Sequence, residues 1–260
     1  MIRYTVLGSG SSGNSYIIMQ EHASLIFDAG FSLSDMKRRA SQAAIPFESI
    51  QAMFITHMHP DHCRGAGVFS RKTALPVYVH ESLVQERRPE LESLRISTES
   101  LRTFPLGAPV QVGPFAVTAF ATSHDSPHSV GYRIAVDGKI FLLLTDTGKV
   151  TDEMRELAKQ ADVLFLEANY ERNMLQTGPY PLYLKRRIAG EWGHLSNDDA
   201  IGLLHDCKAE SDRHRRVYFC HLSKTNNDPS VLAKTCGARL DWDGEITICA
   251  NNHQYTGEFA

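Results

Sequence analysis

Four potential metal ligands fall within six residues of one segment, "THMHPDHCRG": His57, His59, Asp61 and His62. Neutral imidazoles and carboxylates are the ligands that hydrolytic divalent metals such as Zn²⁺ and Mn²⁺ take in proteins. The segment directly follows the short apolar run "AMFIT", and a loop at a strand end can aim alternate side chains inward. His57 and His59 can then bind one ion. Asp61 and His62 turn toward a second.

Three further candidate ligands end apolar, strand-like runs later in the chain: His124 in "FAVTAFATSH", Asp146 in "KIFLLLTD" and His221 in "RRVYFCH". Together with the first segment they supply seven ligands, enough for two ions. His124 fits the first ion and His221 the second, with Asp146 shared between them. Asp28, which ends "SLIFD", is expected to brace the metal loop, since ligand histidines take carboxylate partners.

The chain contains His-Leu-Ser twice, in "GHLSNDD" and "CHLSKTN", and the two surroundings differ. His221 follows a strand-like run, which is the position of a metal ligand. The other segment begins a helix, with Ser196 as cap and Asp199 completing an S-x-x-D box. His194 therefore lies just before a helix N-terminus, which favours phosphate. We expect His221 to bind metal and His194 to act on a phosphate group.

Strands and helices alternate along the chain. A helix is expected over Leu33 to Ala44, capped by Ser34, and another over 151–160. The glycine-rich "GSGSSGNS" reads as a tight turn whose Asn14 can brace a neighbouring loop. Several strands are hairpin-linked, as at "VDGK", so a purely parallel doubly wound sheet is not expected. With no linker or long repeat, residues 1–260 are predicted to form one domain.

Composition indicates an ordinary soluble protein, with 42% hydrophobic residues and a net charge of −3. Nucleic-acid binding would therefore depend on local basic runs, at 37–39, 185–187 and 213–216, which are also typical of solvated helix faces. The sequence predicts no membrane span and no signal peptide. Five scattered cysteines without a C-x-x-C pair favour a reducing compartment, so the cytoplasm is expected.

The motif H-x-H-x-D-H, followed by a separated His, Asp and His, resembles the metallo-β-lactamase fold over nearly the whole chain. The resemblance implies an αββα sandwich, an α/β architecture with two mixed β-sheets face to face, helices outside and metals at one edge. The combination of "GSGSSGNS", "THMHPDH", "TDTG", "EWGHLSNDDA" and "HLSKTNN" is similar to the YycJ/WalJ subfamily. Its members are regarded as DNA exonucleases that work from 5′ ends with two divalent metals, which implies Mn²⁺ or Zn²⁺ and a DNA substrate here.

A similarity to ribonuclease Z, a phosphodiesterase of the same fold, bears on His194. That enzyme has a His-Ser-Thr segment opening a helix and a Glu-Ala-Thr segment before it. Here "GHLSN" and "LEAN" occupy comparable places. The resemblance implies a pair of His194 and Glu167 that acts on the leaving group.

These residues suggest metal-assisted phosphodiester hydrolysis by in-line attack of an activated water. Asp61, besides binding metal, can orient that water, and His194 can protonate the leaving oxygen. Phosphate-positioning groups are expected in the helix N-terminus and in three side chains: Ser196, Lys224 and Asn226.

Three alternatives stay open on the sequence. A cyclic or small phosphodiester could be the substrate, since no appended nucleic-acid domain is evident. A thioester hydrolase of the same fold has less need of a histidine before a helix N-terminus. A non-catalytic metal-bound regulatory protein is a different class, and the complete ligand set argues against it. Measured turnover distinguishes the last from the others.

Overall fold

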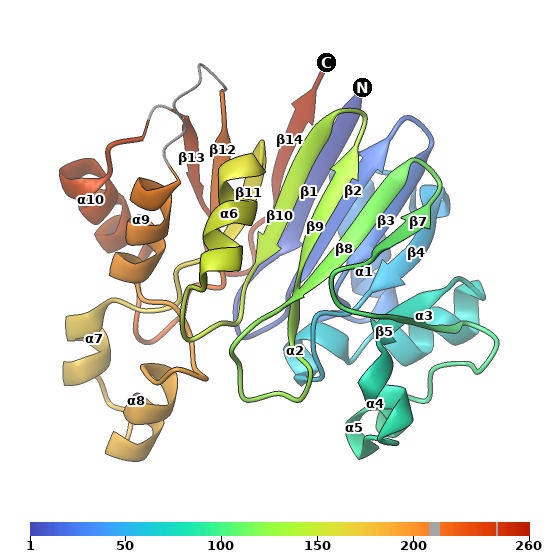
Figure 1. Ribbon diagram of the computed structural model, residues 1–260, viewed down its shortest axis with the longest axis horizontal. Helices are drawn as coiled ribbons and strands as arrows, with labels where there is room; N and C mark the ends of the chain where they lie inside the picture. The colour runs from blue at the N-terminus through green and yellow to red at the C-terminus, as the bar shows by residue number, and fades with distance from the viewer. Residues whose placement is uncertain (208–213, 243) are drawn as a thin grey trace.

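The computed structural model describes residues 1–207, 214–242 and 244–260 (Figure 1). Arg213, the first residue of one predicted basic run, lies outside the described residues. The described chain forms two β-sheets of seven strands each. The chain ends lie side by side at the top of Figure 1, where the last strand pairs with the first. Because both ends share one sheet, we propose that residues 1–260 fold as a single domain.

The first sheet is antiparallel over its first four strands and parallel from the fourth to the last. Its order is β14 (Tyr255–Phe259), β1 (Ile2–Gly8), β2 (Ser15–Gln20), β3 (Ala23–Phe27), β4 (Ile50–Phe54), β5 (Val77–His80) and β6 (Leu101–Phe104).

The second sheet has three parallel pairings and then three antiparallel ones. Its order is β13 (Glu245–Ile248), β12 (Arg216–Cys220), β11 (Val163–Glu167), β10 (Lys139–Leu144), β9 (Val130–Val136), β8 (Phe115–Ala121) and β7 (Pro109–Val112). The antiparallel part includes the hairpin expected at Asp137-Gly138, which joins β9 to β10.

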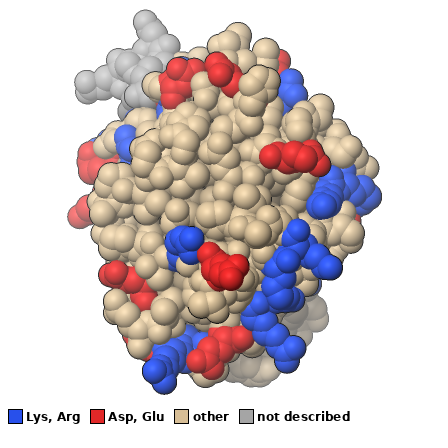
Figure 2. Space-filling model, turned by 90° about the vertical axis from the view of Figure 1, so that its right-hand side faces the viewer, with Lys and Arg blue, Asp and Glu red and all other residues tan. Residues whose placement is uncertain are grey.

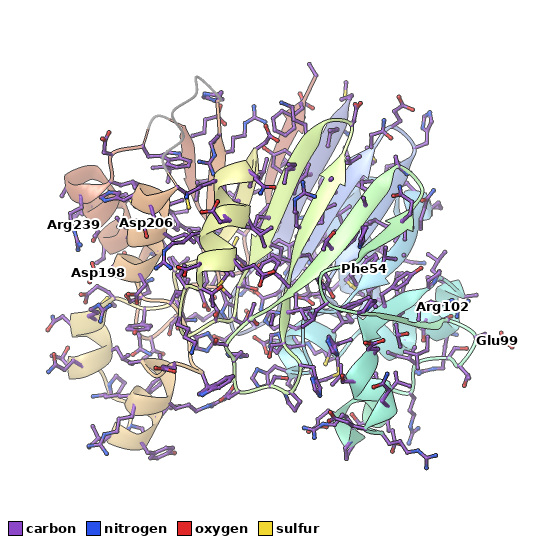
Figure 3. The ribbon with its side chains drawn as sticks, in the orientation of Figure 1. Phe54, Glu99, Arg102, Asp198, Asp206 and Arg239 are labelled. Carbon is purple, nitrogen blue, oxygen red and sulfur yellow. The ribbon has the colours of Figure 1, made fainter. Side chains whose placement is uncertain are left out.

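Aromatic side chains fill the space between the two sheets. Tyr4 on β1 contacts Phe141 on β10 with ring centroids 5.2 Å apart, and Phe27 on β3 contacts Tyr132 on β9 at 5.5 Å. Phe54 lies inside the fold next to them (Figure 3) and is fully buried. Each buried ring removes a large apolar area from water, so the face-to-face packing is the main source of stability.

Helices cover the outer face of each sheet. On the first sheet, apolar residues of α1 (Leu33–Gln42), α2 (Pro60–Cys63) and α3 (Ala66–Thr73) pack in one cluster. On the second, those of α6 (Asp152–Gln160), α9 (Asn197–Asp206) and α10 (Pro229–Arg239) form another. Asp198 and Arg239 join α9 to α10 by an ion pair at the outer surface (Figure 3). The predicted αββα sandwich with mixed sheets is confirmed.

Shorter helices extend from the lower end of the sandwich in Figure 1: α4 (Glu81–Gln85), α5 (Pro89–Leu94), α7 (Arg172–Thr177) and α8 (Leu182–Ile188). The 3₁₀ turn η1 (Phe47–Ser49) directly precedes β4. Among the residues described, none of the helices has the length and apolarity needed to cross a bilayer. The face at the right of Figure 1 carries both cationic and acidic side chains on a largely uncharged surface (Figure 2). That face therefore offers no field of one sign.

The predicted basic runs differ in exposure. The Arg39 guanidinium is buried and donates to the carbonyl of Leu7 at 2.8 Å. Arg215 is likewise buried and donates to the carbonyl of Ala161 at 2.9 Å. These two arginines brace the backbone. Among the described residues of the runs, the exposed cations are Lys37 and Arg38 on α1 and Arg186 and Arg187 on α8.

The N-terminus of α1 corrects one prediction. Ser32, not Ser34, is the N-cap, and its hydroxyl accepts a hydrogen bond from the backbone N–H of Asp35 at 3.2 Å. The helix ends at Gln42, two residues before the expected Ala44. Ser34 lies inside the first turn, where its backbone is already helical and cannot adopt the extended cap conformation.

Replacing Ser32 with Ala should lower the free energy of unfolding by about 1 kcal/mol, because the N–H of Asp35 loses its acceptor. Ser41→Ala is the matched control and should cost less, since Ser41 is exposed on the same helix and caps nothing. Urea denaturation followed by far-ultraviolet circular dichroism measures both. Equal losses for the two variants would place the cap elsewhere.

Candidate metal centre

The predicted site residues gather at the lower end of the sandwich, beside α2 (Figure 1). Three of them directly or closely follow strands and have a left-handed backbone: Asp28 (φ 62°), Asp146 (φ 58°) and His221 (φ 57°). Each conformation costs about 1–3 kcal/mol for a residue other than glycine. The turn is what brings each side chain back over the end of its strand, so backbone strain is concentrated where the polar cluster is built.

The seven predicted ligands form contiguous groups. In each group the nitrogen and oxygen atoms that could bind metal lie within 4.8 Å of one another. The groups include one of His57, His59 and His124, and one of Asp61, His62 and His221. They are the two triads expected from the sequence.

Asp146 occupies the middle of the cluster. Its Oδ2 lies 3.3 Å from His62 Nε2, and its Oδ1 lies 3.6 Å from His124 Nε2 and 3.5 Å from His221 Nδ1. The carboxylate is almost fully buried. It therefore lies between the two triads, where a shared ligand would have to be.

Outer hydrogen bonds fix four of the histidine rings. His62 Nδ1–H donates to Asp28 at 2.7 Å and His124 Nδ1–H to the carbonyl of Gly193 at 2.9 Å. His57 Nδ1 lies 3.0 Å from Thr56 Oγ1, and His221 Nδ1 lies 2.9 Å from Glu167 Oε1. With Nδ1 engaged, each ring turns Nε2 inward. Ligand histidines show this arrangement, which sets the tautomer and the orientation of the ring.

Electrostatics in the cluster favour added positive charge. Burial lowers the pKa of His57 well below its usual value. Burial also opposes a charge on His62, but Asp146 and Asp28 raise its pKa to about 9. Asp146 similarly raises the pKa of His221 against the effect of burial. The carboxylates thus draw protons onto inward-facing imidazoles, and divalent cations would satisfy the same demand.

Three buried atoms at the centre have no hydrogen-bond partner within the described part of the chain: His57 Nε2, Asp146 Oδ2 and His221 Nε2. Unpartnered buried polar atoms are costly, so a cluster of them implies a further group. Imidazole nitrogens and carboxylate oxygens are ligands of borderline divalent ions. The residues present therefore fit a divalent-metal centre.

Glu167 ends β11 and holds two histidines at once. Its Oε1 lies 2.8 Å from His194 Nδ1 and 2.9 Å from His221 Nδ1, and its Oε2 accepts the backbone N–H of Leu195 at 3.0 Å. The carboxylate is fully buried, and despite burial the charge of His194 holds its pKa well below the usual range. The expected pair of His194 and Glu167 is thus within hydrogen-bonding distance, and Glu167 also braces a predicted ligand.

The predicted phosphate-positioning residues do not face the cluster together. Ser196 caps α9 as predicted, but its hydroxyl is buried and shared with Asp199 in the capping box. The backbone N–H of Asn197 donates to the carbonyl of Tyr170 at 2.9 Å, so this helix N-terminus is already used internally. Asn226 is fully buried, and its backbone carbonyl accepts a hydrogen bond from the N–H of Glu171. This placement does not favour phosphate contacts.

Lys224 alone of the three side chains is exposed. It lies three residues after His221, on the loop that leaves β12. Its charge is thus available at the surface near the site. A phosphate contact for Lys224 stays a prediction.

Several contacts of the site were not predicted. Thr56 Oγ1 donates to Asp28, and Asn169 Nδ2 donates to the carbonyl of His221 at 2.8 Å. Asp125 Oδ1 lies 3.5 Å from His59 Nε2. Thr56 and Asp125 are chain neighbours of predicted ligands, which is the signal that could have identified them. Asn14 braces the metal loop as expected, through its N–H to the carbonyl of Asp61 at 2.8 Å.

Replacing Asp28 with Ala should weaken metal binding by about 10- to 100-fold, because His62 loses the carboxylate that orients it. Metal affinity is measured by competition with a chromogenic chelator. Asp35→Ala is the control, since that carboxylate is exposed on α1 and pairs only with Arg38 among the contacts described. Equal affinities for both variants would show that Asp28 does not support the centre.

Comparisons with known proteins agree with this geometry. The profile of the Beta-lactamase superfamily domain matches residues 24–222. The chain is 34% identical over 225 residues to exodeoxyribonuclease WalJ of Streptococcus pneumoniae serotype 2 (strain D39), covering 86% of this chain and 83% of that protein. It is 33% identical over 243 residues to exodeoxyribonuclease YycJ of Bacillus anthracis, covering 94% and 90%.

Among solved structures, the metallo-β-lactamase fold protein YhfI from Bacillus subtilis aligns with a TM-score of 0.72. The alignment covers 98% of this chain and 99% of that protein at 19% identity. At this identity the likeness concerns the fold alone. It matches the arrangement of two mixed sheets with helices outside.

Proposed function

This chain belongs to the β-lactamase superfamily, and on that premise we propose that it is a two-metal phosphodiesterase that degrades DNA as a 5′-to-3′ exonuclease. The observation that carries the proposal is the position of His194. Its Nδ1 is fixed by Glu167 at 2.8 Å and lies 3.6 Å from Asp146, and its side chain is 19% exposed. A histidine held between the metal cluster and solvent is placed to serve a leaving group.

Two divalent ions, Mn²⁺ or Zn²⁺, are proposed for the centre. One would be held by His57, His59 and His124, the other by Asp61, His62 and His221, with Asp146 contacting both. When bound, the ions would supply a water-derived nucleophile near neutral pH and neutralise charge on the phosphate.

The remaining roles fall to side chains of this chain. Asp61 Oδ2 faces His221 Nε2 at 3.5 Å, which leaves its Oδ1 to accept a hydrogen bond from the attacking water. His194, in its protonated form, donates to the leaving oxygen from Nε2. Glu167 acts through His194 by holding its Nδ1, and so is a positioning residue. In this proposal Asp61 on α2 serves the attacking water, and His194 before α9 serves the leaving oxygen of an in-line displacement.

The choice of DNA as substrate is supported by relatives. Two proteins that are 33–34% identical over most of this chain are both named exodeoxyribonucleases. The structure supports the reaction type through the donor set, whereas the polymer and the polarity derive from the resemblance. A small phosphodiester is the other outcome of the test.

The test uses protein stripped of metal and reloaded with Mn²⁺ or Zn²⁺. Strands of DNA and RNA labelled at the 5′ or the 3′ end, single or duplex, are incubated with it, and bis-p-nitrophenyl phosphate is assayed in parallel. Loss of 5′-terminal nucleotides one by one, only after reloading, is the expected result. If the protein hydrolyses the small ester but leaves the DNA and RNA strands intact, its substrate is a small phosphodiester. No turnover of any ester would reject a phosphodiesterase.

A further inference from the structure

The cluster is open to solvent along one edge. Most of its side chains are buried, but the side chains of four residues are between 19% and 31% exposed: His59, Asp61, Asp125 and His194. A polymer substrate must reach the centre along this edge. Groups that flank it are therefore the first to meet the nucleotides next to the scissile bond.

Trp192 flanks this edge. The residue is 60% exposed, although the backbone of the next residue is well fixed. The N–H of Gly193 donates to Gly190 at 2.9 Å, and the carbonyl of Gly193 accepts the Nδ1–H of His124 at 2.9 Å. The ring thus projects into solvent one residue from a contact to a predicted metal ligand, and two residues from His194. Stability of the core does not require an indole there.

Charged side chains lie near this ring. Lys149, three residues after Asp146, has its Nζ 5.9 Å from the ring centroid of Trp192 and 3.1 Å from the exposed carboxylate of Glu191. Arg187 on α8 forms an ion pair with Asp125 at the open edge. Arg186 is exposed, and no contact to an acidic side chain is found for it within residues 1–207, 214–242 and 244–260. An anionic ligand lying along Trp192 would therefore compete with Glu191 for Lys149, whereas Arg186 on α8 is exposed without such an acidic partner in the described part of the chain.

A second ring lies on α8. Tyr183 is 74% exposed and precedes Arg187 by one helical turn, so the two share a face of α8. That face carries the ion pair to Asp125 at the edge of the centre. In Figure 1, α8 lies at the same lower end of the molecule as α2. Exposed rings among cations are how proteins bind single strands, with bases stacked on rings and phosphates beside Lys and Arg.

We infer that Trp192, with Tyr183 as a second ring, stacks on unpaired bases of a single-stranded nucleic acid whose phosphates contact Lys149 and Arg186. The inference rests on the proposed function and narrows its substrate to strands with unpaired ends. In a duplex the base faces are covered by neighbouring base pairs, so a duplex cannot use these rings without opening. The exposed ring next to His194 therefore selects for single strands.

The sequence permits a direct test, because Trp192 and Trp242 are its two tryptophans. Trp242 packs against the guanidinium of Arg215 at 4.7 Å, away from the centre. In the variant Trp242→Phe, emission reports on Trp192 alone. Zn²⁺-loaded protein is titrated with an eight-residue oligothymidylate whose phosphorothioate links resist hydrolysis. We expect saturable quenching of the emission.

Two ligands serve as controls. An abasic phosphorothioate strand of equal length has the phosphates without the bases, and a blunt duplex has the bases without free faces. Neither should quench at concentrations that saturate with the oligothymidylate. Equal quenching by the duplex, or none by any strand, would overturn the inference.

Affinity gives a second measurement. Trp192→Ala should weaken binding of the oligothymidylate about 5- to 150-fold, the loss of stacking on one base, and Trp192→Phe should restore part of it. Leu182→Ala is the matched control, since Leu182 is equally exposed on α8 without a ring, and it should bind as the parent does. Unchanged affinity of Trp192→Ala would contradict the inference. Hydrolysis of bis-p-nitrophenyl phosphate by the Trp242→Phe protein tests the proposed function separately.

Discussion

Replacing Asp146 with Ala removes bound metal and lowers phosphodiester hydrolysis by about 10³-fold or more, which is the loss of several kcal/mol of charge stabilisation. The reason is its central position. One buried carboxylate lies 3.3–3.6 Å from nitrogens of His62, His124 and His221, so its loss affects both triads. Metal content by inductively coupled plasma mass spectrometry and turnover of bis-p-nitrophenyl phosphate measure the two effects.

A second variant separates this loss from misfolding. Asp146 has φ 58°, a conformation that Ala disfavours and Asn tolerates. Asp146→Asn should therefore fold like the parent and still lose metal, because the amide has no charge. Asp206→Ala is the control, an exposed carboxylate on α9 that pairs with Arg155. Two ions and full turnover in Asp146→Asn would show that the shared ligand lies elsewhere.

The grouping of the seven candidate ligands could be predicted from the sequence because its geometry is local. His57 directly follows one apolar run, and a parallel strand that ends in a polar residue delivers it to the same edge of the sheet as its neighbours. His62 lies on α2, five residues later. Asp146 and His221 follow β10 and β12, which both pair parallel with β11. His124 follows β8, which is two antiparallel pairings from β10 and so runs in the same direction. Position relative to a strand end therefore predicts which residues meet, without knowledge of how the two sheets face each other.

Which side chains could contact a phosphate group could not be predicted in this way. Ser196 and Asn226 have suitable side chains near predicted ligands, but tertiary packing decides whether a hydroxyl or amide faces outward. Ser196 is used by its own helix as a cap, and Asn226 is covered by the segment after β11. The same limit applies to Gly193, whose backbone carbonyl fixes His124. No side-chain pattern marks a carbonyl as functional.

The electrostatics explain why the strain at Asp28, Asp146 and His221 is tolerated. Each left-handed residue costs stability, and the polar cluster that results contains buried atoms without hydrogen-bond partners. Bound ions would offset both, since a ligand that binds only the folded state stabilises it by mass action. Loading with metal should therefore raise the thermal midpoint, and a chelator should lower it. A thermal midpoint that changes neither on metal loading nor on addition of a chelator would argue against ions in this cluster.

Replacing His194 with Ala should leave the metals bound and lower DNA hydrolysis by about 10²–10⁴-fold, the usual contribution of a general acid. Metal should be retained because Glu167, held by the N–H of Leu195, still braces His221 after the ring of His194 is gone. The control is His205→Ala, an exposed histidine later on α9, which should hydrolyse DNA at the parent's rate.

The leaving group separates an acid from a structural role for His194. The p-nitrophenolate of bis-p-nitrophenyl phosphate departs without a proton, whereas the sugar oxygen of DNA needs one. His194→Ala should therefore lose much less activity on the small ester than on DNA, at equal metal content. Equal losses on both esters would mean that His194 shapes the centre instead of protonating the leaving oxygen. In that case Glu167 would remain as a brace of His221, and the acid would have to come from solvent at the open edge beside His59 and Asp61.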